Sequence, residues 1–211
     1  MRGPAGRCPN CSAPITFRWS SAVQTVCESC RSVVVRHDVD LDAIGEVSDL
    51  PPDSSPLQLG TEGRFDGRPF TVIGRIGYEY DGGGWNEWHL AFGDGSSGWL
   101  SDAQAEYAVS VLTTPTVPLP TLQGLKVGIP YSWQGEGLQV TTLTKARYAG
   151  VEGELPFEYW GKDQVLFVDL RSHGLRFATI DYSETPPLLF VGRLVEYDEL
   201  ELRHVRTFEG W

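Results

Sequence analysis

The residues best placed to do chemistry are four cysteines, which are all the cysteines of this chain. They form two pairs, Cys8-Pro-Asn-Cys11 and Cys27-Glu-Ser-Cys30, with two residues inside each pair and fifteen between the pairs. This spacing is typical of zinc sites, because each pair can bind one ion through two thiolates. Four thiolates complete a tetrahedral site and leave no position for water, so we expect a structural Zn²⁺.

The alternatives for the cysteines are two disulfides or four unrelated thiols. Disulfides fit poorly, because nothing before Cys8 resembles a secretory signal and we expect the protein in the cytoplasm. A piece shorter than about 40 residues also needs a metal or a crosslink to fold. Ser12 stands where glycine is common after the second cysteine, so the first knuckle departs slightly from the usual pattern.

Alternating apolar and polar residues surround the cysteine pairs and predict three short strands, at 15–19, 23–26 and 32–35. We therefore predict a zinc ribbon over residues 1–36. Residues 37–56 are acidic and then rich in proline and serine, which indicates an extended linker.

Composition predicts the class of the remaining chain. The 24 glycines and 14 prolines among 211 residues favour a turn-rich, all-β protein. The net charge is −11, divided into +4 for residues 1–36 and −15 for residues 37–211. This balance argues against a protein that covers nucleic acid or an anionic membrane with its whole surface. The longest apolar run, 188–191, is far too short for a transmembrane segment.

The body shows a similarity to itself at a distance of 68 residues. Leu57-Gln-Leu-Gly60 corresponds to Leu125-Lys-Val-Gly128, and the match continues at Phe65-Asp-Gly67 with Trp133-Gln-Gly135. Either this is chance similarity between two β-rich segments, or the body holds two related antiparallel β modules, which we favour. We place them at 57–120 and 121–211, as separate barrels or as one sandwich.

The stretch from Trp85 to Asp102 is the richest in aromatic and polar side chains. Strand parity places Trp88 on a core face, whereas Trp85, Glu87 and His89 share the opposite, outer face. Glu87 beside His89 is the best candidate for a catalytic dyad, although such residues on a strand are usually solvated. Trp85 is a candidate partner anchor, unless the other module covers it.

The chain resembles the bacterial family called domain of unknown function 4178. The likeness rests on 57–60, 72–76, 85–88 and 98–101, with a four-cysteine ribbon in front, and it covers most of residues 44–205. It implies a small β-rich accessory protein with no established activity, in the setting of a membrane-stress-related complex.

Three functions follow as expectations. The first is a non-enzymatic interaction or adaptor protein with an unknown protein partner, for which a peripheral complex at the membrane face is one setting. The second is an enzyme or small-ligand binder with a pocket around Glu87, His89 and Trp99. The third and weakest is nucleic-acid binding through the ribbon arginines, because an acidic body and a negatively charged thiolate site oppose it.

Overall fold

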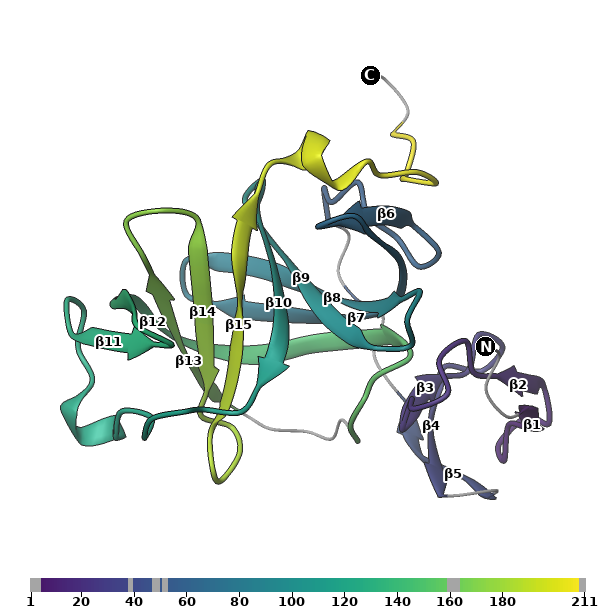
Figure 1. The fold of residues 1–211 in the computed structure, drawn as a ribbon. Helices are drawn as coiled ribbons and strands as arrows, with labels where there is room; N and C mark the ends of the chain where they lie inside the picture. The colour runs from purple at the N-terminus through teal and green to yellow at the C-terminus, as the bar shows by residue number, and fades with distance from the viewer. Residues whose placement is uncertain (1–4, 38–39, 47–49, 51–52, 159–163, 209–211) are drawn as a thin grey trace.

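The computed structural model describes residues 5–37, 40–46, 50, 53–158 and 164–208. Fifteen strands and two short 3-10 turns make up its regular structure, so the all-β prediction is confirmed. Figure 1 shows a small N-terminal ribbon beside a larger β body. No helix in these described ranges is long and apolar enough to cross a bilayer.

The ribbon consists of two small antiparallel sheets. One pairs β1 (Ala5–Arg7) with β2 (Pro14–Thr16), and the other has the order β3 (Gln24–Val26), β4 (Ser32–His37), β5 (Asp40–Glu46). The strand β5 corrects the predicted boundary at residue 36, because it pairs with β4 where we expected a linker. The acidic residues of this segment made it resemble a linker in the sequence. In the structure Asp40 and Asp42 are exposed to solvent, and Leu41 between them packs on the ribbon core.

The body contains ten strands. Its first five are β6 (Glu62–Phe65), β7 (Arg68–Tyr80), β8 (Gly83–Phe92), β9 (Ser97–Ala103) and β10 (Glu106–Thr113). After the 3-10 turn η1 (Leu122–Gly124) come β11 (Pro130–Trp133), β12 (Glu136–Gly153), β13 (Val165–Arg171), β14 (Arg176–Asp181) and β15 (Leu188–Val195). The second 3-10 turn, η2 (Tyr197–Leu200), leads to a C-terminal segment that crosses β6 (Figure 1).

All ten strands belong to one antiparallel sheet that closes on itself. Its order runs from β7 through β8, β9, β10, β15, β14, β13 and β12, and β12 pairs back onto β7. Strands β6 and β11 extend from β7 and β12 as hairpins. The two halves of the body are thus hydrogen-bonded along two seams, β7–β12 and β10–β15, and they form one continuous structure rather than separate barrels.

The same backbone arrangement occurs in both halves, 68 residues apart. Gly60 N–H donates to the carbonyl of Val72 at 2.8 Å, and Gly128 N–H donates to the carbonyl of Val140 at 2.8 Å. Gly60 and Gly128 have φ values of 88° and 91°, a region that glycine enters without steric cost. In both halves a two-residue turn with positive φ follows, at 66–67 and 134–135.

Three apolar clusters fill the body. One lies in the first half around Trp88, Leu90 and Phe92, which confirms the predicted core face of β8. A second lies in the second half around Val168 and Ile180. The third joins residues of both halves, and it covers the face of β8 that we expected to point outward. Parity alone could not show this covering, because the second half comes from distant sequence.

Candidate functional sites

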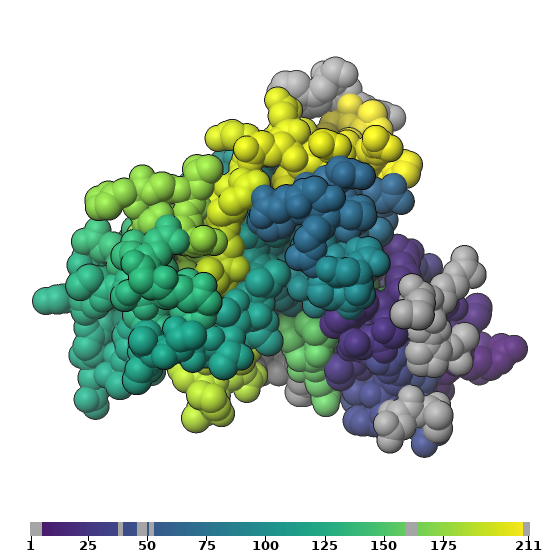
Figure 2. Space-filling view, in the orientation of Figure 1, coloured from purple at the N-terminus to yellow at the C-terminus, as the bar shows by residue number. Residues whose placement is uncertain are grey.

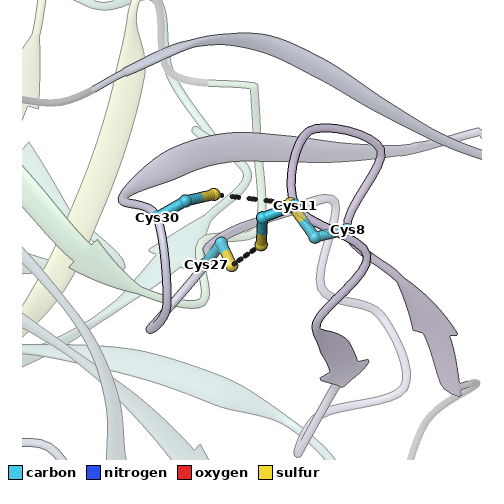
Figure 3. A group of neighbouring side chains, drawn as sticks. All are labelled: Cys8, Cys11, Cys27 and Cys30. Atoms are coloured by element: carbon cyan, nitrogen blue, oxygen red, sulfur yellow. Dashed lines mark hydrogen bonds between the residues drawn. The ribbon is translucent and has the colours of Figure 1, made fainter.

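The four cysteine sulfurs converge between the two knuckles of the ribbon (Figure 3). Cys8 Sγ lies 3.6 Å from Cys30 Sγ, Cys11 Sγ lies 3.7 Å from Cys27 Sγ, and all four sulfurs lie within 4.8 Å of one another. A disulfide would need a separation of about 2.05 Å, so these are four reduced thiols. The sequence pattern therefore located a group that can hold a metal ion.

The backbone of the two knuckles is equivalent. Ser12 N–H donates to the carbonyl of Cys8 at 2.8 Å, and Arg31 N–H donates to the carbonyl of Cys27 at 2.9 Å. Ser12 and Arg31 have φ values of 61° and 62°, in the left-handed region that glycine usually occupies. The non-glycine residue after each second cysteine is thus accommodated without changing the knuckle.

The charges of the sulfurs also favour a cation among them. Hydrogen bonding with the side chain and the backbone of Ser32 lowers the pKa of Cys30 to about 6. A backbone hydrogen bond at Ala13 lowers the pKa of Cys11, but the neighbouring thiols and burial raise it to about 12. Four thiolates so close together repel one another, and a divalent cation removes that repulsion.

Backbone and side-chain hydrogen bonds join the ribbon to a short segment of the body after β12. Glu154 accepts hydrogen bonds from the backbone N–H groups of Arg18 at 2.6 Å and Trp19 at 2.9 Å. Leu155 N–H donates to the carbonyl of Gln24 at 2.9 Å, which extends the ribbon sheet by one bridge. Figure 2 shows the ribbon in direct contact with the body. The ribbon is therefore docked on the body.

His89 lies at this joint and is completely buried. Its Nδ1 is 2.8 Å from the carbonyl oxygen of Glu154, and its ring lies between those of Trp19 and Trp99, with centroids 5.1 and 4.9 Å away. Burial lowers the pKa of His89 to about 4, so the imidazole is neutral at physiological pH. His89 is thus a packing residue between ribbon and body.

Glu87 has a different environment, although it lies on the same face of β8. Both carboxylate oxygens accept from Ser101 Oγ at 2.8 Å, and Oε1 also accepts from Trp85 Nε1 at 3.0 Å. Burial raises the pKa of Glu87 from 4.5 to about 7, and its hydrogen bonds only partly offset that rise. Because His89 bonds to Glu154 instead, the predicted Glu87–His89 dyad is not the arrangement of the structure.

The two tryptophans of the predicted site are both covered by the second half or its flanking segment. Trp85 stacks on Tyr78 with centroids 4.9 Å apart and meets Phe167 edge-on at 5.6 Å. Trp99 is 8% exposed, and its ring stacks on that of Phe157 with the centroids 6.0 Å apart. Trp85 is therefore part of an internal wall, which agrees with the alternative in which the other module covers it rather than with an outward partner anchor.

A cavity of about 550 Å³ lies between the two halves, and Glu87 is on its wall. Strands β8, β9 and β10 line one side, and β12, β13 and β14 line the other. A smaller pocket of about 50 Å³ shares Glu87, Ser101 and Phe167 with this cavity and is also lined by Trp99. The cavity opens at Glu106 and Arg171, whose side chains are 51% and 34% exposed. This volume is in the usual range for small-molecule sites.

The sequence did not reveal the second wall of this cavity. Asp169 and Thr179 face Glu87 from β13 and β14, but neither lies in a motif, and they are about 80 and 90 residues away along the chain. Glu154 and Trp19 were missed at the ribbon joint for the same reason. A contact between distant strands leaves no local pattern that sequence reading can detect.

The ribbon arginines are partly engaged within the chain. Arg36 Nη2 donates to the carbonyl of Ser20 at 2.7 Å, and the guanidinium lies over the ring of Phe17 at 4.9 Å. Arg7 Nη1 donates to the carbonyl of Ser12 at 3.0 Å. These two arginines support ribbon structure, which leaves less basic surface for nucleic acid.

Fold and sites together define an all-β protein with an N-terminal four-cysteine ribbon and a closed sheet around a cavity. The chain belongs to the family described as Domain of unknown function (DUF4178), whose sequence profile matches residues 58–197. The match thus covers the body and begins after the ribbon. No curated protein and no solved structure matches the chain.

Proposed function

We propose that Cys8, Cys11, Cys27 and Cys30 bind one structural Zn²⁺. Sulfurs at about 2.3 Å from a tetrahedral zinc lie about 3.8 Å apart, close to the 3.6 and 3.7 Å of the two contacts described. The donor set of four thiolates suits zinc, and a closed site gives the ion no role in chemistry.

Elemental analysis of the purified chain tests this assignment. We expect one zinc per chain, and less than about half of that in Cys11→Ser. Ser12→Ala, beside the same knuckle, is the control and should retain the full zinc content. A metal-free chain with four titratable thiols, or with two disulfides, would contradict the proposal.

We further propose that the body is a small-ligand-binding unit, and the observation that carries this is the cavity at Glu87. A carboxyl group held by Ser101 and Trp85 inside a cavity costs free energy to desolvate. The wall combines such polar groups with the aromatic rings of Trp85, Phe167 and Phe177, a combination typical of ligand sites. In this proposal the ribbon stabilises the body at the Glu154 joint.

Mass spectrometry of small molecules released on denaturation tests the ligand-binding proposal. We expect wild-type chain, purified from the cells in which it occurs, to release a ligand at near-stoichiometric amounts. Ala103→Trp should lose it, because Ala103 lines the cavity. Ala43→Trp, on the exposed face of β5, is the matched control. Retention of the ligand by Ala103→Trp would contradict binding in this cavity.

We also retain the adaptor function as a second proposal, which exposed apolar side chains favour. Leu112, Leu122 and Val127 are 61%, 55% and 63% exposed and lie on or near the connector between the halves. Clustered exposed apolar residues are common at sites of protein contact. Crosslinking in intact cells tests this: Leu122→Asp should remove a specific crosslinked partner, whereas Leu175→Asp, with leucine equally exposed, should not. An unchanged crosslink in Leu122→Asp would exclude this surface.

We also propose that the two halves are related copies of one β unit. The hydrogen bonds of Gly60 and Gly128, at the same 68-residue distance as the sequence similarity, support this relation. The cytoplasmic location and the membrane-stress setting stay predictions, which cell fractionation can check.

A further inference from the structure

We infer that the cavity between the two halves binds a small organic cation with a primary ammonium group. This inference rests on the ligand-binding function proposed above, and it names the chemical class of the ligand. Three features of the wall carry it: an excess of carboxyl groups over basic groups, aromatic rings and hydroxyl groups.

The first feature is the charge of the cavity wall. Glu87, Glu106 and Asp169 supply three carboxyl groups, and among the described residues that line the cavity Arg171 is the one basic side chain. Arg171 donates from Nη1 and Nη2 to the two carboxylate oxygens of Glu106, with Nη1 2.9 Å from Oε2. Among the described residues of the wall, this leaves Glu87 without a basic partner, since its donors are the neutral groups of Ser101 and Trp85. Asp169 accepts a hydrogen bond from Thr179 and shares the charge of Arg171 with Glu106.

Carboxyl groups in such a position favour a positively charged ligand. Burial raises the pKa of both Glu87 and Asp169, which means that ionised carboxylates are costly there without a cation. An ammonium group removes that cost and gains charge-assisted hydrogen bonds. An anionic ligand would add further repulsion to the same wall. The charges of the wall therefore favour a ligand that carries a positive charge.

The second feature is the aromatic part of the wall. Trp85, Phe167 and Phe177 line the cavity, and Trp85 and Phe167 meet with centroids 5.6 Å apart. The face of an aromatic ring attracts a cation, and its apolar surface binds the carbon part of an organic ligand. A bare metal ion would make no use of these rings. The wall thus suits an alkyl- or arylalkyl-ammonium ion.

The third feature is the set of hydroxyl oxygens beside the carboxyl groups. Ser101 lies 2.8 Å from Glu87, and Thr179 bonds to Asp169 from the neighbouring strand. A primary ammonium has three N–H donors, which need acceptors in several directions. A quaternary ammonium has none and would leave these oxygens unused. The wall therefore favours a primary amine in its charged form.

Binding of such an ion should depend on pH, because Glu87 must ionise to attract it. The ionisable groups around Glu87 come from several strands: Tyr78 and Tyr80 of β7, Asp102 of β9, Glu106 of β10, Asp169 and Arg171 of β13, and Asp181 of β14. For a carboxyl group with pKa about 7, the ionised fraction rises about tenfold between pH 6 and pH 8. We therefore expect binding to tighten about tenfold over this range.

Calorimetric titration of the full, zinc-loaded chain tests the inference. The ligands are propylamine, phenethylamine and tryptamine, each compared with the alcohol and the carboxylate of the same carbon skeleton, at pH 6 and pH 8. We expect at least one amine to bind at least about tenfold more tightly than its alcohol at pH 8. Glu87→Gln should weaken that amine about tenfold and remove the pH dependence.

Two variants keep the result interpretable. Asp169→Asn provides a second carboxyl substitution if Glu87→Gln folds poorly, and it should also weaken the amine. Glu136→Gln removes an exposed carboxyl group at the far end of β12 and should leave binding unchanged. Circular dichroism confirms the fold of each variant.

The outcomes separate this inference from the function on which it rests. If alcohols or carboxylates bind as tightly as the amines, the inference of a cationic ligand is wrong, but the proposal of a ligand-binding cavity stands. Failure of every amine to exceed its alcohol overturns the inference as well. If none of the compounds binds and the purified wild-type chain releases no ligand, both the inference of an ammonium ligand and the ligand-binding proposal are wrong.

Discussion

The indole of Trp19 meets the imidazole of His89 edge-on, with ring centroids 5.1 Å apart, and this contact joins the ribbon to the body. The ring of His89 is also held by the backbone carbonyl of Glu154. The carboxylate of the same Glu154 accepts a hydrogen bond from the backbone N–H of Trp19. The ribbon and the body thus share one buried joint, in which each part supplies groups that the other leaves unsatisfied.

Truncation of Trp19 should weaken this joint. Trp19→Ala removes the contact with His89 and the hydrogen bond from Nε1 to the carbonyl of Gly95 at 2.9 Å. We expect a loss of about 3 kcal/mol in the free energy of unfolding, measured by denaturant titration. Trp19→Phe keeps the apolar contact and should lose about 1 kcal/mol. Equal stability of wild type and Trp19→Ala would show that the joint contributes little.

Metal removal should unfold the ribbon and expose the joint. The proposed Zn²⁺ would supply on the order of 10 kcal/mol to the folding of such a small unit. After chelation we expect hydrogen exchange to become fast in residues 5–37 and at Leu155, while strands β13 and β14 stay protected. Added zinc should restore the protection. Unchanged exchange in a chain shown to be metal-free would contradict a structural role for the metal.

The raised pKa of Glu87 should make the stability of the folded chain depend on pH. Its pKa is about 7 in the folded chain and near 4.5 when unfolded, so between these values the folded state holds a proton that the unfolded state has released. Stability therefore falls as pH rises from about 4.5 to about 7. Because Glu87 is only partly buried, we expect a cost of about 2 kcal/mol above pH 7.

The variant Glu87→Gln isolates this effect in denaturant titrations at pH 4 and pH 8. The variant should match wild type at pH 4 and exceed it at pH 8, because it carries no charge at either pH. Glu136→Gln should show no such difference, because its carboxyl group is exposed. A variant that is less stable than wild type at pH 8 would contradict the prediction.

The β10–β15 seam between the halves should not tolerate a side chain at Gly192. A Cβ at Gly192 would lie 1.7 Å from the carbonyl oxygen of Val109, so β10 and β15 could not keep their pairing. We expect Gly192→Ala to cost more than about 3 kcal/mol in the free energy of unfolding. Gly137→Ala is the control, since no atom lies within 4 Å of its Cβ position, and it should be neutral or slightly stabilising.

The cysteine site and the class of fold were predictable because their signals are local. The spacing of Cys8, Cys11, Cys27 and Cys30 alone located a cluster that the folded chain brings together. Alternation predicted the buried face of Trp88, which Leu90 and Phe92 share. The dipeptide Asp66-Gly67 is typical of a tight turn, and it joins β6 and β7 with φ values of 48° and 74°.

Tertiary structure alone decided the roles of Glu87 and His89. Both occupy one face of β8, and sequence parity makes them equivalent. The second half covers Glu87 and leaves a cavity beside it, whereas Glu154 and Trp19 enclose His89 completely. Strand parity assigns a side chain to a face of its own strand, but what covers that face depends on pairings between residues distant in sequence.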